Sequence, residues 1–265
     1  MPPSPTPWTV LVLGGTAEAR ALAARLDGRP GLRVVSSLAG RVSRPVLPAG
    51  EVRVGGFGGA AGLAAWTRAE GVRAVVDATH PFAQTISANA AQACARAGVP
   101  LLRLARPAWT ARPGDDWRVA GSLEEAAALL PALGSRVFLT TGRQGLSVFA
   151  SLDELWFLIR CVDPPSGPMP ARGEVLLARG PYARDDERAL MRRFGVEVLV
   201  TKNSGGALTE GKLDAARDLG LPVVMVSRPV PAPGVPSVAD VAGAVGWVLT
   251  RAPRPGRAPA GSAAG

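Results

Sequence analysis

Cysteine is scarce in this chain, and long apolar runs are absent. The two cysteines, Cys94 and Cys161, have neither the spacing of a metal site nor the density of a disulfide framework. We therefore expect a reduced, cytoplasmic protein that holds no metal. No run of about 18 apolar residues occurs, which argues against a membrane-spanning helix. The opening MPPSPTP has no basic region followed by an apolar stretch, so it does not resemble a secretory signal.

Lysine is nearly absent although the chain is basic, with a net charge of +9. Apart from Lys202 and Lys212, all the cationic side chains are arginines. A basic surface can bind nucleic acid, but here the arginines are scattered and aromatic residues do not interleave with them. The excess is also compatible with a solvated arginine-rich surface. A third interpretation is a pocket for a ligand with several carboxylates, which guanidinium groups bind in bidentate geometry.

The 265 residues, 47% of them apolar, suffice for one large α/β domain or two small ones. Apolar runs and helical periodicity alternate along the chain, which predicts parallel sheets with helices on both faces. Strands are predicted at 8–13, 32–36, 52–54, 73–77, 100–104, 137–140, 156–159, 175–177, 196–200 and 223–226. Helices are predicted at 17–26, 63–70, 87–97, 122–133, 185–194 and 213–219, with a last helix capped by Ser237 and ending at Leu249.

The chain divides into two similar halves. Residues 106–121, with Pro107, Pro113 and Gly114, are typical of a connection between domains. The predicted fold class is α/β, with two Rossmann-like domains, mostly parallel sheets and a cleft between them. We expect a flexible tail over 1–7, domains over 8–110 and 111–250, and a disordered tail over 251–265.

The segment from Gly14 to Ala19 follows the first strand and opens a helix. Glycines allow a pyrophosphate to approach the backbone closely, and a helix N-terminus favours its charge. The spacing departs from G-x-G-x-x-G, because Ala19 stands near the third glycine position. The alternative is an ordinary tight turn between a strand and a helix.

The second strand leads into Ser36-Ser37-Leu38-Ala39-Gly40-Arg41. An acidic residue at this strand end selects NAD, whereas small polar residues with an arginine accommodate a 2′-phosphate. No acid is present, so the segment favours NADPH. The alternative is a surface arginine in a turn.

The only histidine lies in Asp77-Ala78-Thr79-His80-Pro81-Phe82-Ala83, directly after a buried strand. Polar residues at the carboxyl end of such a strand lie where open α/β sheets bind their ligands. Thr79 supplies a hydroxyl, His80 a titratable ring, and Pro81 a rigid backbone. The alternative is a hydrogen-bonded loop histidine without a ligand.

Two loops of the second half have the same character. Thr201-Lys202-Asn203-Ser204-Gly205-Gly206 and Thr140-Thr141-Gly142-Arg143 each follow an apolar strand and offer cationic and hydrogen-bonding side chains. The alternative for both is a turn with a helix cap. Tyr182 is the only tyrosine, and Asp186 stands where a short-chain dehydrogenase has its lysine. The sequence contains no serine elbow, metal cluster or P-loop.

Taken in order, these strings resemble the precorrin-6A reductase family of cobalamin biosynthesis. The strings that carry the resemblance are LGGTAEA (13–19), SLAGR (37–41), VGGFGG (54–59), DATHPFA (77–83), RGP (179–181) and TKNSGG (201–206). Each is weak alone, but the ordered set is specific and spans nearly the whole chain. The resemblance implies a monomeric oxidoreductase with NADPH as cofactor. Its substrate would be the tetrapyrrole precorrin-6A, reduced to precorrin-6B by hydride delivery to C19.

The resemblance also places the ligands on the two domains. The first would bind NADPH and the second the tetrapyrrole, with no nucleic-acid or membrane partner and only transient contacts with neighbouring pathway enzymes. The predicted cofactor-binding residues are Gly14, Gly15, Thr16, Glu18, Ser37, Leu38, Ala39, Gly40, Arg41, Asp77, Ala78 and Thr79. The candidate catalytic residues, among which the sequence does not choose, are His80, Tyr182 and Lys202. The predicted substrate-binding residues are His80, Arg143, Tyr182, Lys202, Asn203 and Ser204.

Two rival functions remain at this point. One is a different NAD(P)-dependent Rossmann reductase, against which the missing tyrosine–lysine pair counts. The other is a basic protein without chemistry that binds free tetrapyrrole or nucleic acid. Steep salt dependence and indifference to NADPH would identify the second rival.

Overall fold

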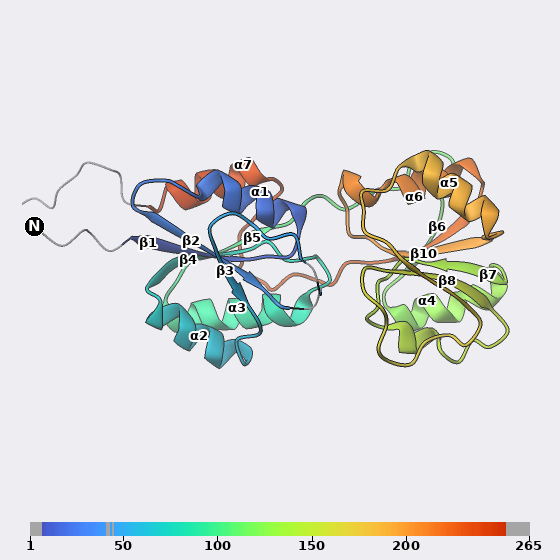
Figure 1. Cartoon of the computed structure of the whole chain (residues 1–265), viewed down its shortest axis with the longest axis horizontal. Coiled ribbons are helices and arrows are strands. Elements are labelled where there is room, and N and C mark those ends of the chain that lie inside the picture. Colours follow the sequence, from blue (N-terminus) through green and yellow to red (C-terminus); the bar gives the residue numbers. More distant parts are fainter. Residues whose placement is uncertain (1–6, 41–42, 44, 253–265) are drawn as a thin grey trace, which may run out of the picture. The chain divides into compact units, whose positions relative to one another are not determined.

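The computed structural model describes residues 7–40, 43 and 45–252, and its chain forms two compact units (Figure 1). The first unit consists of the chain up to Arg106 together with the chain from Val230 onward, and the second runs from Pro107 to Pro229. Among the described residues, no helix combines the length and the apolar character needed to cross a membrane. The cleft expected between the domains stays a prediction.

The first unit contains a six-stranded, entirely parallel sheet. Its strands are β1 (Trp8–Leu13), β2 (Leu32–Leu38), β3 (Glu51–Val54), β4 (Val72–Asp77), β5 (Leu101–Leu104) and β12 (Ser237–Val238). Their order across the sheet is β3-β2-β1-β4-β5-β12. This is the 3-2-1-4-5-6 order of a dinucleotide-binding fold, with the sixth position filled by a strand from the far end of the chain.

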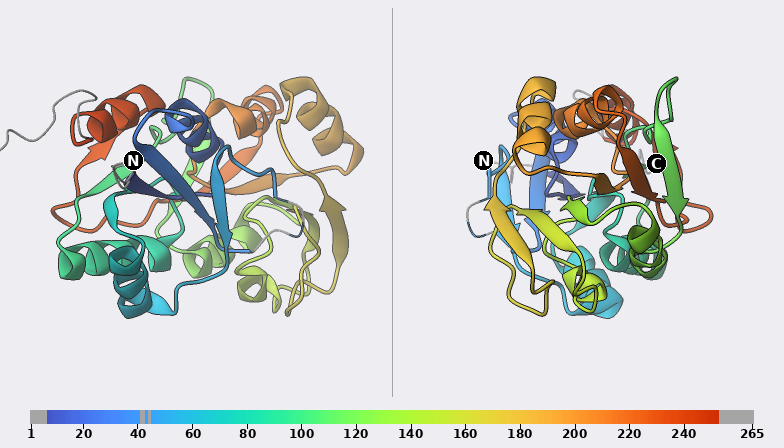
Figure 2. Two further views of the ribbon diagram at one scale, coloured as in Figure 1. Left: turned by 60° about the vertical axis from the view of Figure 1, so that its left-hand side comes forward. Right: turned by 90° about the vertical axis from the view of Figure 1, so that its right-hand side faces the viewer.

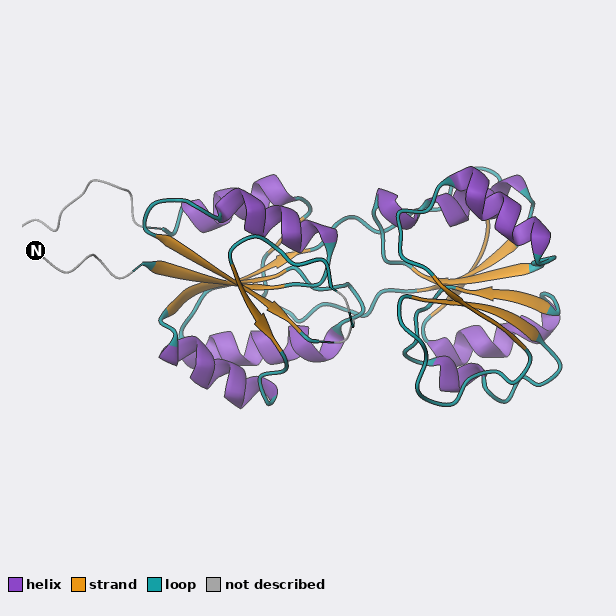
Figure 3. Cartoon of the chain, viewed as in Figure 1, coloured by secondary structure: helices purple, strands orange, loops and turns teal. Residues whose placement is uncertain are grey.

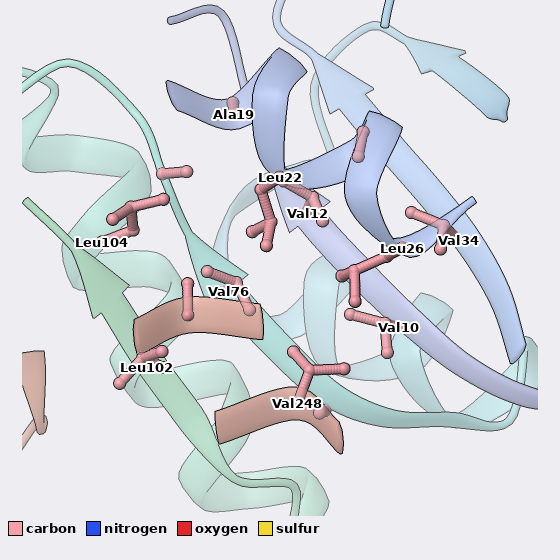
Figure 4. Packing of buried hydrophobic residues seen from close by; sticks show 14 residues of the cluster. Val10, Val12, Ala19, Leu22, Leu26, Val34, Val76, Leu102, Leu104 and Val248 are labelled. Atoms are coloured by element: carbon pink, nitrogen blue, oxygen red, sulfur yellow. The ribbon is translucent and has the colours of Figure 1, made fainter. Parts of the chain in front are cut away.

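Helices cover both faces of this sheet (Figure 3). They are α1 (Ala17–Leu26), α2 (Gly59–Ala69), α3 (Gln84–Ala97) and α7 (Val241–Leu249). Helices α1 and α7 pack together on one face, and α2 and α3 on the other. Figure 4 shows Leu22 and Leu26 of α1 lying over Val10 and Val12 of β1, with Val248 of α7 in the same cluster. All five side chains are fully buried, so both helices are anchored by apolar contact with the sheet.

The return of the chain corrects the predicted domain boundary. Residues 230–250 were assigned to the second domain by their position in the sequence, whereas β12 pairs with β5 and α7 packs on α1. Ser237 begins β12 rather than capping the last helix. The cap is Asp240, whose carboxylate accepts from the Gly243 amide at 2.8 Å.

The second unit repeats the architecture with a different connectivity. Its strands are β6 (Asp116–Ala120), β7 (Arg136–Leu139), β8 (Trp156–Cys161), β9 (Gly173–Leu177), β10 (Val198–Lys202) and β11 (Pro222–Val226). All neighbours are parallel, in the order β9-β8-β7-β10-β11-β6, and the twist of the strands can be followed in the turned views of Figure 2. Strand β6 lies inside the segment predicted as a connection; it has few apolar residues, and of these only Ala120 is buried.

The helices of the second unit also lie on both faces of its sheet (Figure 1). They are α4 (Leu123–Leu129), α5 (Arg184–Arg193) and α6 (Gly211–Asp218), with short 3₁₀ turns η1 (Leu130–Ala132), η2 (Leu146–Phe149) and η3 (Ala207–Thr209). Helices α5 and α6 pack against each other, and α4 contacts the opposite face. The serine half of the predicted capping box is present, since Ser122 accepts from the Glu125 amide at 3.1 Å. The Glu125 carboxylate accepts at 2.7 Å from the Gly121 amide, one residue before the cap, instead of from the Ser122 amide.

Candidate functional site

The carboxyl ends of β1 and β4 form the topological switch point of the first sheet. The chain leaves β1 toward β2 on one side and leaves β4 toward β5 on the other, so the two following loops are neighbours. The Thr16 hydroxyl joins them by donating to the Ala78 carbonyl at 2.7 Å, and the same oxygen accepts from the Ala19 amide at 3.1 Å. One threonine therefore caps α1 and fixes the distance between the loops.

The glycine turn after β1 leaves the N-terminus of α1 accessible. Gly15 is exposed at φ +111°, and a Cβ placed there would meet no atom within 4 Å. Gly14 is packed instead, since its Cβ would lie 3.5 Å from the Ala19 and Leu38 side chains. A residue with a side chain would be strained at position 15 and would stand in the open space above the helix. Gly15 is thus the point where an anion can reach the α1 amides.

Glu18, a predicted cofactor residue, carries a carboxylate in the first turn of α1. Alone it would repel a phosphate at the same helix end. Arg106 donates to it at 2.7 Å, with both side chains mostly buried. The ion pair neutralises that charge and leaves the helix N-terminus suited to an anion.

The end of β2 presents its two serines to opposite faces of the sheet. Ser36 shares the α1 face with Val34 and Leu38, and with Leu38 it lines a small hollow beside Gly14 and Gly15. The Ser37 side chain points away from that face. Its backbone carbonyl contacts the glycine turn after β1 by accepting from the Gly14 amide at 2.9 Å.

Ser36 is not among the predicted cofactor-binding residues, which include Ser37. The alternation of side chains along β2 was the signal that could have found it. Of the other residues predicted after β2, Ala39 and Gly40 are exposed, and Arg41 lies outside the described residues.

Asp77 at the end of β4 shapes its own loop. Its Oδ1 accepts from the Thr79 amide at 3.1 Å and the Thr79 hydroxyl at 2.6 Å, and its Oδ2 accepts from Arg103 at 3.3 Å. The carboxylate is buried, so these donors offset its desolvation. Arg103, which also donates to Ser87 at 3.1 Å, has a supporting role that the sequence analysis did not identify.

His80 is exposed at the tip of the same loop. Its Nδ1 accepts from the Phe82 amide at 3.3 Å, so a neutral ring carries its proton on Nε2. The Phe82 ring lies 5.8 Å away. The backbone thus fixes both the orientation and the tautomer of the only histidine.

The second unit has its own switch point, between β7 and β10. The Thr140 hydroxyl donates to the Val200 carbonyl at 2.9 Å, and the Lys202 ammonium donates to the Thr141 carbonyl at 3.1 Å. Burial lowers the pKa of Lys202 from its ordinary value. Arg143 lies half-buried in the same turn. Two of the predicted substrate residues, Lys202 and Arg143, are therefore brought to one sheet edge, where their charges suit carboxylates.

Thr141 is a residue that the substrate predictions passed over. Its hydroxyl is buried and has no hydrogen-bond partner among the described residues, while its carbonyl holds Lys202. Such a hydroxyl, next to an ammonium, can be satisfied by a ligand oxygen.

Asn203 links the loop after β10 to the backbone of Trp109. Its Oδ1 accepts from the Trp109 amide at 2.8 Å, and its Nδ2 donates to the Trp109 carbonyl at 3.0 Å. The loop also approaches Pro107 so closely that a Cβ on Gly205 would lie 2.0 Å from its carbonyl oxygen. Arg228 donates to the Ser204 carbonyl at 3.0 Å. Asn203 and the Ser204 backbone therefore set the shape of the loop.

Tyr182 lies half-buried against a charged pair. The Arg160 guanidinium stacks 3.7 Å from the centre of its ring and pairs with Glu187, whose Oε2 lies 2.8 Å from Nη2. The Tyr182 hydroxyl donates to the Ala178 carbonyl at 2.9 Å. Burial is the main cause that raises the pKa of Tyr182. The phenol thus has a structural partner and holds its proton firmly.

No cluster of metal-ligating side chains occurs within residues 7–40, 43 and 45–252. The predicted site residues fall into two groups, one for each unit. Gly14, Gly15, Thr16, Ala78 and Thr79 gather at the edge of the first sheet, and Lys202 and Arg143 at the edge of the second. The first group is suited to a dinucleotide and the second to a polyanion.

Comparisons with known proteins agree with this architecture. The family described as "Precorrin-6x reductase CbiJ/CobK" matches residues 9–249. A precorrin-6A reductase of Rhodococcus erythropolis is 60% identical over 241 residues, covering 91% of this chain and 97% of that protein. A precorrin-6A reductase of Mycobacterium tuberculosis is 53% identical over 240 residues, covering 90% and 96%. A solved structure named "CobK precorrin-6A reductase" superposes with a TM-score of 0.86 at 44% identity, covering 92% of this chain and 97% of that one.

Proposed function

The chain belongs to the precorrin-6x reductase family, and on that premise we propose that it reduces one double bond of precorrin-6A with NADPH to give precorrin-6B. It is an oxidoreductase of cobalamin biosynthesis. The observation that carries the cofactor half of the proposal is the open glycine turn at the switch point of the first sheet.

The residues of the first unit fit a nicotinamide dinucleotide. The pyrophosphate would lie on the amides after Gly15, where no side chain intrudes and the helix end favours negative charge. The nicotinamide would lie by Thr79, in the loop that Thr16 holds beside the turn. The bound dinucleotide supplies a hydride, which is chemistry that no side chain can perform.

The end of β2 supports NADPH rather than NADH as the cofactor. Leu38 stands at the last position of the strand, where an acidic residue would bind the ribose diol and repel a 2′-phosphate. An apolar residue there removes that repulsion. Arg41, predicted from the sequence to contact the phosphate, stays a prediction.

The second unit would hold the substrate by its carboxylate arms. Lys202 and Arg143 would supply the cations, and the Thr141 hydroxyl a donor that has no partner within the described part of the chain. Holding the macrocycle in one orientation is the main catalytic task of these residues, because hydride transfer requires close and aligned reacting carbons.

The reaction adds a hydride to C19 and a proton elsewhere on the conjugated system. Both electrons of the reduction would arrive with the hydride supplied by NADPH, leaving NADP⁺ as the co-product. Of the three candidate donors, Tyr182 is disfavoured, since its hydroxyl donates to a backbone carbonyl and burial raises its pKa, which leaves His80 and Lys202. With Nδ1 accepting from the Phe82 amide, the neutral His80 ring would present Nε2–H to the substrate as a hydrogen-bond donor, and proton delivery would require the imidazolium form, which gives up that contact.

The proposed function is tested by mixing purified protein with precorrin-6A and NADPH. Loss of the dihydronicotinamide absorbance together with a shift of the pigment band is the expected result. Oxidation of NADPH without a pigment change would indicate a different reductase substrate. A pigment shift without NADPH oxidation would indicate a tetrapyrrole-binding protein.

His80→Asn tests the role of the histidine. We expect a folded enzyme that binds NADPH as the wild type does, with turnover or substrate affinity lower by about tenfold or more. The exposed position of His80 makes a loss of folding stability unexpected. The checks are steady-state kinetics across pH and thermal melting. Wild-type kinetics would refute the assignment, and retention of the histidine limb in the pH profile would refute proton donation.

A further inference from the structure

The hollow at the end of β2 contains a cation that the function described so far does not use. Arg20, on the fourth position of α1, lines it together with Gly14, Gly15 and Ser36. The side chain is half-buried and makes no hydrogen bond or ion pair with any residue that the structure describes. Other arginines of this unit, such as Arg33, Arg103 and Arg106, are bound by carboxylates.

Arg20 is also unfavourably placed for helix stability. A cation in the first turn opposes the positive end of the helix dipole, where acidic residues are preferred. Glu18 in the same turn does not compensate for it, because its carboxylate is paired with Arg106. An anion bound between the glycine turn and Arg20 would give the guanidinium a partner and would offset its unfavourable interaction with the helix dipole.

A second, independent feature of the hollow points to a ligand. The Ser36 side chain is 1% exposed, and its hydroxyl has no hydrogen-bond partner among the described residues. Buried hydroxyl groups are normally paired, and Ser36 is directed to the face that lines the hollow. A ligand oxygen would provide the missing partner.

The remaining lining defines the ligand chemistry. No acidic side chain lines the hollow within the described part of the chain, and Leu38 and Val46 supply apolar surface. Val46 is 55% exposed, so it can be covered by a planar group. An anionic group flanked by an apolar ring matches the adenosine end of a phosphorylated dinucleotide.

We propose that Arg20 binds the 2′-phosphate of NADPH, with Ser36 as a further donor, and that Arg20 determines the preference for NADPH over NADH. This inference rests on the proposed use of a nicotinamide dinucleotide. This places the specificity on helix α1, whereas the sequence pattern alone predicts it at the segment after β2.

The test is calorimetric binding of NADP⁺, NAD⁺, 2′,5′-ADP and 5′-AMP to the wild type and to Arg20→Ala. The variant should bind NADP⁺ and 2′,5′-ADP about 10- to 150-fold more weakly, the range for a lost charge-assisted hydrogen bond. NAD⁺ and 5′-AMP, which lack the phosphate, should change by less than about threefold. Arg25→Ala is the matched control, because it removes the same charge from the exposed last turn of the same helix.

Ser36→Ala adds a readout that a structural serine would not give. Its thermal midpoint should equal or exceed that of the wild type, since an unpaired buried hydroxyl is removed, while NADP⁺ binding weakens. Equal losses for NADP⁺ and NAD⁺ in Arg20→Ala, or no loss, would overturn the inference and leave the reductase function intact. A wild type that binds neither dinucleotide would overturn both.

Discussion

Replacement of Lys202 with methionine is expected to weaken precorrin-6A binding by about 10- to 150-fold while NADPH binding stays nearly unchanged. The ammonium is held at the β7–β10 edge by the Thr141 carbonyl, and its burial strengthens an ion pair with a carboxylate. Methionine keeps the apolar stem and removes the charge. Fluorescence titration of each ligand separately is the measurement. A loss confined to NADPH would move this loop to the cofactor side.

The pH dependence of Lys202 has a definite sign. Burial lowers its pKa below the ordinary 10.5, so the ammonium that binds a carboxylate is lost as pH rises through the lowered value. Substrate affinity should therefore decline on the alkaline side, and the decline should disappear in Lys202→Arg. The other lysine is the matched control: Lys212 donates to the Thr209 carbonyl at 2.7 Å and lies 4.7 Å from the centre of the Trp109 ring. Lys212→Met should lower stability without changing substrate affinity.

Arg160→Ala is expected to cost about 3–5 kcal/mol of folding stability, because it leaves the Glu187 carboxylate buried without its partner. The two side chains are 5% and 3% exposed, so water cannot replace the guanidinium. Tyr182 loses the group on which its ring stacks. Urea denaturation at several pH values is the measurement.

The pH series identifies the cause of that loss. Without Arg160, burial disfavours the charged carboxylate of Glu187, so the stability deficit should shrink as pH falls. The double variant Arg160→Met with Glu187→Met should regain most of the stability. Arg118→Ala, which breaks an exposed pair with Asp116, should cost no more than about 1 kcal/mol. A deficit that is independent of pH would point to lost packing instead.

Much of the fold could be predicted because its strands are buried on both faces. Val10, Leu11, Val12 and Leu13 are all at most 1% exposed, and such apolar runs are visible without tertiary context. Strands β6 and β12 were not predicted, because neither contains a buried apolar run. Strand β12 consists of only Ser237 and Val238 and exists through pairing with β5. The prediction that Ser237 caps the last helix was wrong, because a serine suits a strand end as well as a helix cap. Only the pairing of β12 with β5 decides between the two.

The positions of the site loops were predictable, but the directions of their side chains were only partly so. Apolar runs locate the ends of strands, and they predict Gly15 and Lys202 at the carboxyl ends of two inner strands. Which serine faces the hollow depends on which face of β2 packs against α1, and the alternation of side chains along the strand places Ser36 on that face. The hydrogen bonding of Asn203 with Trp109 joins residues 94 positions apart, and no local sequence pattern predicts such a contact.

The return of the chain to complete the first sheet has a consequence for synthesis on the ribosome. Strands β1 to β5 emerge first, yet β5 lacks its second neighbour, β12, and α1 lacks α7 as its packing partner until residues 237–249 are made. The second unit is complete once β11 has emerged, so it can fold before the first is finished. During that interval the nascent chain displays the apolar surface that α7 later covers, including Leu102 and Val10. A ribosome that stalls after Pro229 would therefore release one finished unit attached to an unfinished one, and that product is a natural substrate for chaperones and proteases.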